Sequence, residues 1–163
     1  MKKTKEFSHL FVSYILPFFS FFIIFFLCMH CGRVVSSSMH PTIKVNDIVF
    51  ANRLAYVTKD PERGDIILFK GSTGIVECKR IVGIPGDEIT FHNGYVYING
   101  IQCDETYLDE NMETNCTKDF KVPENSFFVL GDNRVNSLDS RYLEEPYISM
   151  DHIVGKLCGR ISL

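Results

Sequence analysis

The fold class is decided by residues 88–99, which read Glu88-Ile89-Thr90-Phe91-His92-Asn93-Gly94-Tyr95-Val96-Tyr97-Ile98-Asn99. Short apolar and β-branched runs flank the Asn93-Gly94 pair in this stretch. Asn-Gly readily adopts the positive φ angles of a type I′ turn, which joins two antiparallel strands. Asn99-Gly100 supplies a further turn directly afterwards. The stretch therefore predicts a β-hairpin.

The same pattern of short apolar runs and turn residues continues on both sides of this hairpin. Strands are predicted over residues 47–52, 65–70, 74–82, 88–91, 95–99, 126–130 and 153–161. Residues 103–125 are acidic and polar, and are expected to form a small insertion. We therefore expect a single all-β domain of antiparallel sheets over residues 32–163.

A segment of different composition precedes this domain. Residues 10–29 carry no charged side chain, and eight of the 14 phenylalanines lie within the first 31 residues. Twenty helical residues span ~30 Å, about the thickness of the bilayer hydrocarbon. A cleavable signal peptide is the alternative, but its apolar core is usually shorter and ends at a small-x-small site. We expect a retained transmembrane helix over residues 10–31, kinked at Pro17, after a cytoplasmic tail over residues 1–9.

Charge predicts the orientation of this helix. Lys2, Lys3 and Lys5 precede the apolar run, which places the N-terminus inside and the domain outside the plasma membrane. The chain has a net charge of −3, of which the first 31 residues contribute +2, so the remainder carries −5. A domain this acidic does not attract phosphate backbones, which argues against a nucleic-acid partner.

The six cysteines do not predict a cofactor site. Cys28-x-x-Cys31 has the spacing of a redox or metal motif, but it lies at the membrane boundary without a second pair. Small apolar residues at a helix end are the simpler interpretation. Cys103 and Cys116 flank the polar insertion, and their spacing alone does not establish a disulfide. Neither a metal nor another cofactor is expected.

Candidate nucleophiles follow the apolar run, in Val35-Ser36-Ser37-Ser38-Met39-His40-Pro41-Thr42. Pro41 restricts its own φ and disfavours helix at His40, so we expect an ordered turn that holds a hydroxyl in one direction. A serine hydroxyl is a weak nucleophile and needs a base.

Two side chains are candidates for that base. His40 is near in sequence, without a carboxylate obviously placed to orient it. Lys79 lies in the strand predicted over residues 74–82, on the face that also carries Ile75, Glu77 and Ile81. Burial there would lower the pKa of Lys79 and make the neutral amine available. A solvent-exposed lysine beside Arg80 is the alternative, and these residues alone do not decide.

A third cluster follows the predicted strand 126–130 and reads Gly131-Asp132-Asn133-Arg134-Val135-Asn136-Ser137-Leu138-Asp139-Ser140-Arg141. Short hydrogen-bonding side chains are unusually dense in it. Such residues can hold a neighbouring site in place, for instance when a serine hydroxyl orients a neutral lysine amine.

Taken together, these clusters resemble the type I signal peptidase family of the bacterial Ser–Lys kind, in its compact Gram-positive form. The resemblance covers nearly the whole chain. The matching segments occur in the family's order and are the N-terminal anchor, Ser36-x-Ser38-Met39-x-Pro41-Thr42, Arg63-Gly64-Asp65-Ile66-Ile67, Lys79-Arg80-Ile81-Val82-Gly83-Ile84-Pro85-Gly86-Asp87 and residues 131–141.

The resemblance implies a role for each matching residue. Ser38 would be the nucleophile and Lys79 the general base. The Ser36 hydroxyl and the Ser38 backbone N–H would form the oxyanion hole, and Ser137 would orient the lysine amine. Support for the site would come from Asp132, Asn133, Asp139 and Arg141, the last two as an ion pair.

The resemblance also implies a fold and an activity. The fold would be an assembly of antiparallel sheets with a shallow groove, in which the substrate lies as an added strand. Small side chains one and three residues before the cleaved bond would fill two apolar pockets. The activity would be removal of N-terminal signal peptides from exported preproteins by a membrane-anchored serine endopeptidase. Its partners would be signal peptides and the lipid bilayer, with contact to the secretion machinery left open.

Three residues depart from the family's pattern. Val35 stands where proline is frequent, Val135 where aspartate is common, and Glu77 where an aromatic residue is usual. A charged Glu77 beside Lys79 would favour the protonated amine. We therefore expect either that Glu77 turns to solvent or that activity is weak or shifts to higher pH.

Two alternatives remain open at the level of sequence. The chain could be a dedicated processing protease of the same fold for one exported substrate. It could also be a catalytically silent, anchored β domain that binds extracytoplasmic peptides.

Overall fold

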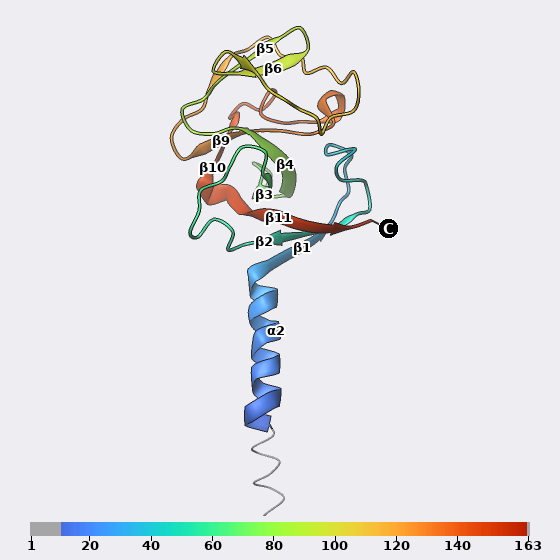
Figure 1. Ribbon diagram of the computed structural model, residues 1–163, viewed down its shortest axis with the longest axis vertical. Coiled ribbons are helices and arrows are strands. Elements are labelled where there is room, and N and C mark those ends of the chain that lie inside the picture. Colours follow the sequence, from blue (N-terminus) through green and yellow to red (C-terminus); the bar gives the residue numbers. More distant parts are fainter. Residues whose placement is uncertain (1–10, 163) are drawn as a thin grey trace, which may run out of the picture.

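The computed structural model describes residues 11–162 (Figure 1). A π-helical turn, η1 (Phe11–Ile15), continues into helix α2 (Leu16–Cys28). Together these 18 residues have a mean hydropathy of 2.4, are long and apolar enough to cross a membrane, and are not buried. Pro17 lies in the first turn of α2, directly after the π-helical turn, and the helix changes from π to α geometry there. The tail predicted over residues 1–9 lies outside the described residues.

The helix ends earlier than the span predicted over residues 10–31. Cys28 is its last residue, and strand β1 (Met29–Arg33) follows at once. This strand pairs antiparallel with β2 (Ile48–Asn52), and the Arg53 N–H donates to the Cys28 carbonyl at 2.8 Å. Composition alone could not locate this boundary, because residues 29–33 acquire strand geometry from partners later in the chain. The helix therefore leads directly into the sheet.

The other strands follow in chain order. They are β3 (Ile66–Lys70), β4 (Val76–Gly83), β5 (Glu88–His92), β6 (Tyr95–Ile98), β7 (Ile101–Gln102), β8 (Phe120–Lys121), β9 (Ser126–Leu130), β10 (Tyr147–Ser149) and β11 (Ile153–Ile161). Short 3₁₀ turns lie at η2 (Arg134–Asn136) and η3 (Met150–His152).

These strands form two antiparallel sheets. The larger sheet has the order β1-β2-β11-β3-β4-β9-β10, and the smaller one has the order β7-β6-β5-β8. In Figure 1 the smaller sheet lies at the end of the molecule farthest from α2. The expected all-β class with one N-terminal apolar helix is confirmed.

The predicted hairpin at residues 88–99 is confirmed as β5 and β6. Asn93 and Gly94 have φ angles of 51° and 82°, as a type I′ turn requires. All seven predicted strands are present, with ends that differ by two residues at most. The unpredicted strands β1, β7, β8 and β10 have only two to five residues, too few to show a periodicity.

Three apolar clusters form the core. The first joins the two sheets and contains Val82, Ile89, Phe91, Val96, Ile98, Phe120, Val122, Phe128 and Leu130. The second contains alternate residues of β3, β4 and β9 and consists of Ile67, Phe69, Ile81, Phe127, Val129 and Ile148. The third contains the segment that follows β1, and consists of Met39, Ile43, Val49, Ala51 and Leu68.

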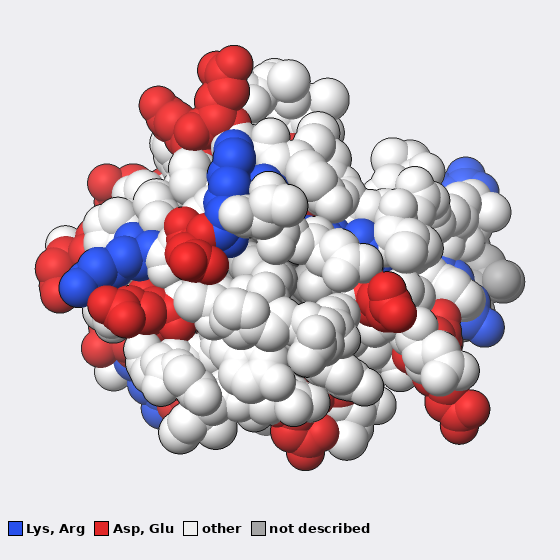
Figure 2. Space-filling view, turned by 90° about the horizontal axis from the view of Figure 1, so that it is seen from above, with Lys and Arg blue, Asp and Glu red and all other residues white. Residues whose placement is uncertain are grey.

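The insertion over residues 103–125 is less separate from the core than its polar composition suggests. Phe120 and Val122 belong to the first cluster, and Cys103 and Cys116 pack against it as free thiols. Figure 2 shows the end of the molecule that carries the smaller sheet. On that face, Asp and Glu side chains are interspersed with Lys and Arg, and no continuous basic area is visible.

Candidate active site

A cavity of about 550 Å³ brings the predicted nucleophile and the predicted base together. Ser36, Ser38 and Lys79 all line it. Most of its other lining is apolar and comes from Val34, Val35, Met39, Ile43, Val49, Leu68, Ile75, Val76, Cys78 and Leu138. This size and lining are typical of a site that takes a ligand.

The predicted nucleophile segment, residues 35–42, is held by the burial of its neighbours. Met39 and Ile43 are only 2% and 1% exposed, and the Ile43 N–H donates to the Met39 carbonyl at 2.8 Å, which closes a tight turn. The peptide bond between His40 and Pro41 within this turn is cis. Because Met39 is fixed in the third apolar cluster, Ser38 is itself buried at 8% exposure. The Ser36 Oγ lies 3.3 Å from the Ser38 Oγ, within hydrogen-bonding distance.

The polar cluster after β9 holds this segment from the other side. The Asn133 N–H donates to the Ser38 carbonyl at 2.9 Å, and its Nδ2 donates to the Ser37 carbonyl at 3.2 Å. The Asn136 Nδ2 donates to the Ser37 Oγ at 2.7 Å. The contact between Ser37 and Asn136 was not predicted, although the density of short polar residues over 131–141 indicated a supporting role for the cluster.

Asp132 connects the segment that carries Ser38 to the strand that carries Lys79. Its carboxylate accepts from Arg80 Nε at 2.8 Å and from Arg80 Nη2 at 2.6 Å. The same carboxylate accepts from Thr42 Oγ1 at 2.5 Å. Arg80 follows Lys79, and Thr42 lies in the turn after Ser38. This buried carboxylate therefore fixes the position of the Ser38 segment relative to the strand that carries Lys79.

Gly131 leaves room for the Ser38 carbonyl and the Ser137 side chain. Arg80 of β4 pairs with Leu130 of β9, so continuing the register by one residue places Gly131 opposite Lys79. A Cβ at Gly131 would lie 2.5 Å from the Ser38 carbonyl oxygen and would overlap the Ser137 Oγ. Only glycine therefore lets Ser38 and Ser137 lie against this part of β9.

Burial lowers the pKa of Lys79 below its ordinary value. The side chain is 5% exposed, and loss of solvation is the largest influence on it. The carboxylates of Glu77 and Asp139 raise the pKa, and Arg141 lowers it, but the net direction is downward. Glu77 lines the cavity rather than turning away from it, so its charge acts on Lys79 without outweighing burial.

Ser137 has a buried hydroxyl that accepts and donates no hydrogen bond among the described residues. An unsatisfied buried polar group costs about 1–3 kcal/mol, so such a group is expected to have a function. Ser137 lies beside the same glycine as Ser38. Its Oγ therefore lies without a hydrogen-bond partner next to the Ser38 carbonyl.

Asp139 and Arg141 form a buried ion pair next to the site. Arg141 Nε lies 2.8 Å from Asp139 Oδ1, and both side chains are almost completely buried. The second carboxylate oxygen of Asp139 accepts from the Gly131 N–H at 3.0 Å. Arg141 also donates to the Arg134 carbonyl at 2.8 Å. The pair thus holds the backbone of the polar cluster at Gly131 and at Arg134.

Two other candidates for reactive groups are not favoured by this geometry. His40 does not line the cavity that contains Ser38. Burial raises the pKa of the Cys78 thiol to about 12, so this cavity residue is a protonated thiol at neutral pH. Arg134, which the sequence did not single out, is fully buried and donates to Glu105 and Thr114 of the insertion.

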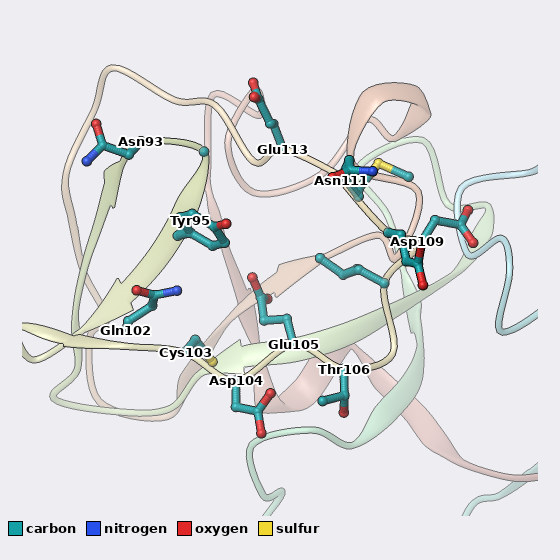
Figure 3. Close-up of a pocket in the computed structure, with 14 residues that line it drawn as sticks. Asn93, Tyr95, Gln102, Cys103, Asp104, Glu105, Thr106, Asp109, Asn111 and Glu113 are labelled. Atoms are coloured by element: carbon teal, nitrogen blue, oxygen red, sulfur yellow. The ribbon is translucent and has the colours of Figure 1, made fainter.

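A second cavity, of about 720 Å³, lies in the insertion and the β5–β6 turn (Figure 3). Its lining includes the acidic side chains of Asp104, Glu105, Asp109, Glu110 and Glu113. The Glu105 carboxylate is already paired with Arg134. Over residues 11–162, no group of three or more His, Cys, Asp and Glu side chains is arranged to hold a metal ion.

Comparison with known proteins identifies relatives of this chain. Residues 5–161 match the family described as "Signal peptidase, peptidase S26". The "Probable signal peptidase I-2" of Synechocystis is 40% identical over 116 residues, which cover 67% of this chain and 53% of that protein. The "Signal peptidase I" of Bacillus amyloliquefaciens is 41% identical over 118 residues, which cover 66% of this chain and 61% of that protein.

A solved structure is similar as well. A signal peptidase I from Enterococcus faecalis matches with a TM-score of 0.51 and 34% identity, over 61% of this chain and 98% of that one. The matched region spans only 53% to 61% of the length of the two relatives named above. The family match extends over almost all of this sequence, and the chain belongs to the signal peptidase family, peptidase S26.

Proposed function

We propose that this protein removes signal peptides from exported proteins, with Ser38 as the nucleophile and Lys79 as the general base. The observation that carries the proposal is the shared cavity, in which Ser38 lies with a buried lysine whose pKa is lowered. The names of the relatives, which are signal peptidases, support the substrate class.

The reaction would proceed through an acyl-enzyme. Neutral Lys79 takes the proton of the Ser38 hydroxyl while Oγ forms a bond to the scissile carbonyl carbon. The tetrahedral oxyanion accepts hydrogen bonds from the Ser36 hydroxyl and the Ser38 N–H; loss of one such donor typically costs ~10²–10³ in rate. Protonated Lys79 then gives the proton to the leaving amine as the peptide bond breaks. Water, deprotonated by Lys79, releases the acyl group and restores Ser38.

Three further groups would keep the base and the nucleophile in register. The Ser137 hydroxyl, which is buried beside Gly131, would orient the Lys79 amine. Asp132 and Asn133 would hold the nucleophile segment through the hydrogen bonds described above. A general base acts only when it lies within hydrogen-bonding reach, so these contacts decide how often a productive geometry occurs.

The apolar helix would anchor the domain to the plasma membrane. Residues 11–28 are long and apolar enough to cross it, and α2 enters β1 without a linker. Lysines at the N-terminus favour a cytoplasmic tail and an extracytoplasmic catalytic domain. Signal peptides and the lipid bilayer would then be the partners, because the cavity begins close to where a substrate's own apolar segment leaves the membrane.

Cleavage of a preprotein by single variants tests this proposal. Ser38→Ala and Lys79→Ala should each reduce cleavage by at least about 10³-fold while the domain stays folded. His40→Ala is the matched control in the same turn and should change the rate only slightly. Normal cleavage by either of the first two variants would overturn the mechanism. Folded protein that binds peptides but never cleaves them would favour the silent binding domain instead.

A further inference from the structure

The polar insertion contacts two arginines that hold the segments of the candidate active site. Tyr107 of the insertion places its ring over the Arg80 guanidinium, with 3.9 Å between Arg80 Cζ and the ring centroid. Arg80 directly follows Lys79 on β4. The Tyr107 hydroxyl donates to Glu105 at 2.8 Å and accepts from Arg134 Nη2 at 3.3 Å. One tyrosine therefore connects two largely buried cations.

Each nitrogen of the Arg80 guanidinium already donates a hydrogen bond. Nε and Nη2 donate to the Asp132 carboxylate, and Nη1 donates to the Gly64 carbonyl at 2.9 Å. Only the flat faces of the guanidinium remain, and an aromatic ring attracts a cation that lies over its own face. The Tyr107 ring therefore shields one face of the ion pair between Arg80 and Asp132, and restricts the tilt of the guanidinium.

The Tyr107 side chain is itself held in place. Burial raises the pKa of Tyr107, so the hydroxyl keeps its proton at neutral pH and donates to Glu105. Glu105 is paired with Arg134, whose Nε donates to the Gly131 carbonyl at 3.0 Å. The ring over Arg80 is thus anchored to the end of β9, where the polar cluster over residues 131–141 begins.

From these contacts we propose that Tyr107 is a positioning residue, which holds Arg80 against Asp132 and so keeps the proposed nucleophile and base in register. The inference rests on the proposed function, since it assumes that nucleophile and that base. The path from the ring is short, because the Asp132 carboxylate also accepts from Thr42 Oγ1, in the turn after Ser38. Tyr107 does not line the cavity that contains Ser38, so loss of the ring should slow the chemical step and leave substrate binding nearly unchanged.

Replacement of the ring tests this proposal, with a preprotein as substrate and rates expressed per folded molecule. In Tyr107→Leu, kcat should fall about tenfold or more, while KM stays within about threefold of the wild-type value. Tyr107→Phe keeps the ring and loses the hydroxyl, and should keep kcat within about threefold of the wild type. Equal losses of kcat in the two variants, or a change confined to KM, would overturn the inference.

Two controls separate positioning from a general loss of structure. Thr114→Val removes an acceptor of Arg134 Nη1, at 2.6 Å in the same network, and should lower stability while kcat per folded molecule stays within about twofold. Tyr97→Leu removes a ring of the smaller sheet that contacts His92 instead of an arginine, and should also keep kcat within about twofold. A loss in either control as large as that in Tyr107→Leu would overturn the inference.

A ring of nearly unchanged shape extends the test to the case in which Tyr107→Leu does not fold. Phenylalanine and trifluorophenylalanine are compared at position 107, because fluorine withdraws electron density from the ring face and weakens its attraction for Arg80. The fluorinated protein should have a kcat about threefold lower or less than that. Equal kcat values for the two proteins would overturn the inference.

The wild-type protein separates this inference from the proposed function. Cleavage of the preprotein by the wild type but not by Ser38→Ala supports the proposed function, whatever the rate of Tyr107→Leu is. A wild-type protein that does not cleave the preprotein overturns the proposed function and the inference together.

Discussion

Lys79 shows how one residue can be unfavourable for stability and still suit a reaction. Burial disfavours the charged amine, which lowers the pKa of Lys79 and makes the neutral form easier to reach than in an exposed lysine. The opposing influence of Glu77 sets how far this shift extends. The balance between burial and a neighbouring carboxylate therefore determines the pH at which the proposed base works.

The pH dependence of cleavage should follow from this balance. The rate should rise with pH as Lys79 loses its proton, and Glu77→Gln should move the rise to lower pH because it removes a charge that favours the protonated amine. The measurement is kcat/KM for one neutral peptide at a series of pH values. A profile that stays flat down to pH ~5 would contradict a lysine base.

Lys79→Met should produce an inactive but more stable protein. The pKa of Lys79 lies below 10.5 in the folded state, so the unfolded state binds more protons at pH values between the two, and stability rises with pH through that window. Replacing the lysine should therefore increase the free energy of unfolding by about 0.5–2 kcal/mol at neutral pH. The gain should shrink as the pH approaches 10.5. Denaturant unfolding at several pH values checks this, and a less stable variant at neutral pH would contradict it.

Ser137 and Ser140 both have buried hydroxyls, but replacing one should affect the cleavage rate and replacing the other should affect stability. Ser137 has no partner in the described residues, whereas the Ser140 Oγ accepts from the Val129 N–H at 2.9 Å. Ser137→Ala should lower the cleavage rate about 10- to 100-fold with little loss of stability, because it removes a hydroxyl that bonds to no other described residue and that we propose orients the lysine amine. Ser140→Ala should instead cost about 1–3 kcal/mol of stability, because it leaves a buried N–H unpaired. Denaturant titration and peptide cleavage together distinguish the two, and equal loss of stability would count against an orienting role.

At the scale of elements, the site depends on how β9 ends. Gly131 follows directly, opposite Lys79, and its missing side chain leaves room for the Ser38 carbonyl and the Ser137 hydroxyl. Gly131→Ala should therefore displace the nucleophile segment and reduce cleavage by at least about tenfold, with a loss of about 1–3 kcal/mol from overpacking. Gly159→Ala on β11 is the control, since a Cβ there meets nothing within 4 Å. Crystal structures or cleavage rates that show no change in Gly131→Ala would contradict the assigned close approach.

At the scale of the whole molecule, α2 and the β domain are structurally separate and are proposed to have separate roles. The helix is not buried against the domain, and β1 carries the chain directly from its last turn into the larger sheet (Figure 1). Tethering raises the effective concentration of substrates that lie in the same membrane. The helix should therefore matter for membrane-bound preproteins and little for free peptides.

Removal of residues 1–28 tests this separation of roles. The shortened chain should cleave a free peptide at a rate within about threefold of the full chain in detergent, because residues 11–28 belong to none of the three apolar clusters. It should cleave a vesicle-bound preprotein at least about tenfold more slowly. Equal rates on the vesicle-bound substrate would show that the helix does not concentrate the enzyme on its substrate.

Local patterns predicted most of the strands, and the reason is visible in the hairpin at residues 88–99. Asn93-Gly94 needs positive φ angles that few other pairs adopt, so the turn was predictable without its neighbours. Strands β1 and β10 were not predicted, because they owe their geometry to pairing with β2 and β9. The predicted end of helix α2 was too late for the same reason, because residues 29–33 form β1 by pairing with β2.

The site divides in a similar way. Ser38, Lys79 and the polar residues over 131–141 stood out from the sequence, through their resemblance to one family. The cavity shared by Ser38 and Lys79, the contact of Ser37 with Asn136 and the partnerless hydroxyl of Ser137 required the packed structure. Each depends on residues far apart in the chain, which no local pattern can bring together.

The sequence by itself therefore determined the β class, the apolar helix and the set of side chains available for chemistry, since these follow from local backbone preferences and composition. The tertiary structure alone decided that Lys79 is buried and that Glu77 lies at the cavity wall. It also decided that the Ser38 carbonyl and the Ser137 hydroxyl both lie against Gly131. The physical reason is that desolvation and close packing are properties of distant segments in contact, and they convert an ordinary serine and lysine into a candidate nucleophile and base.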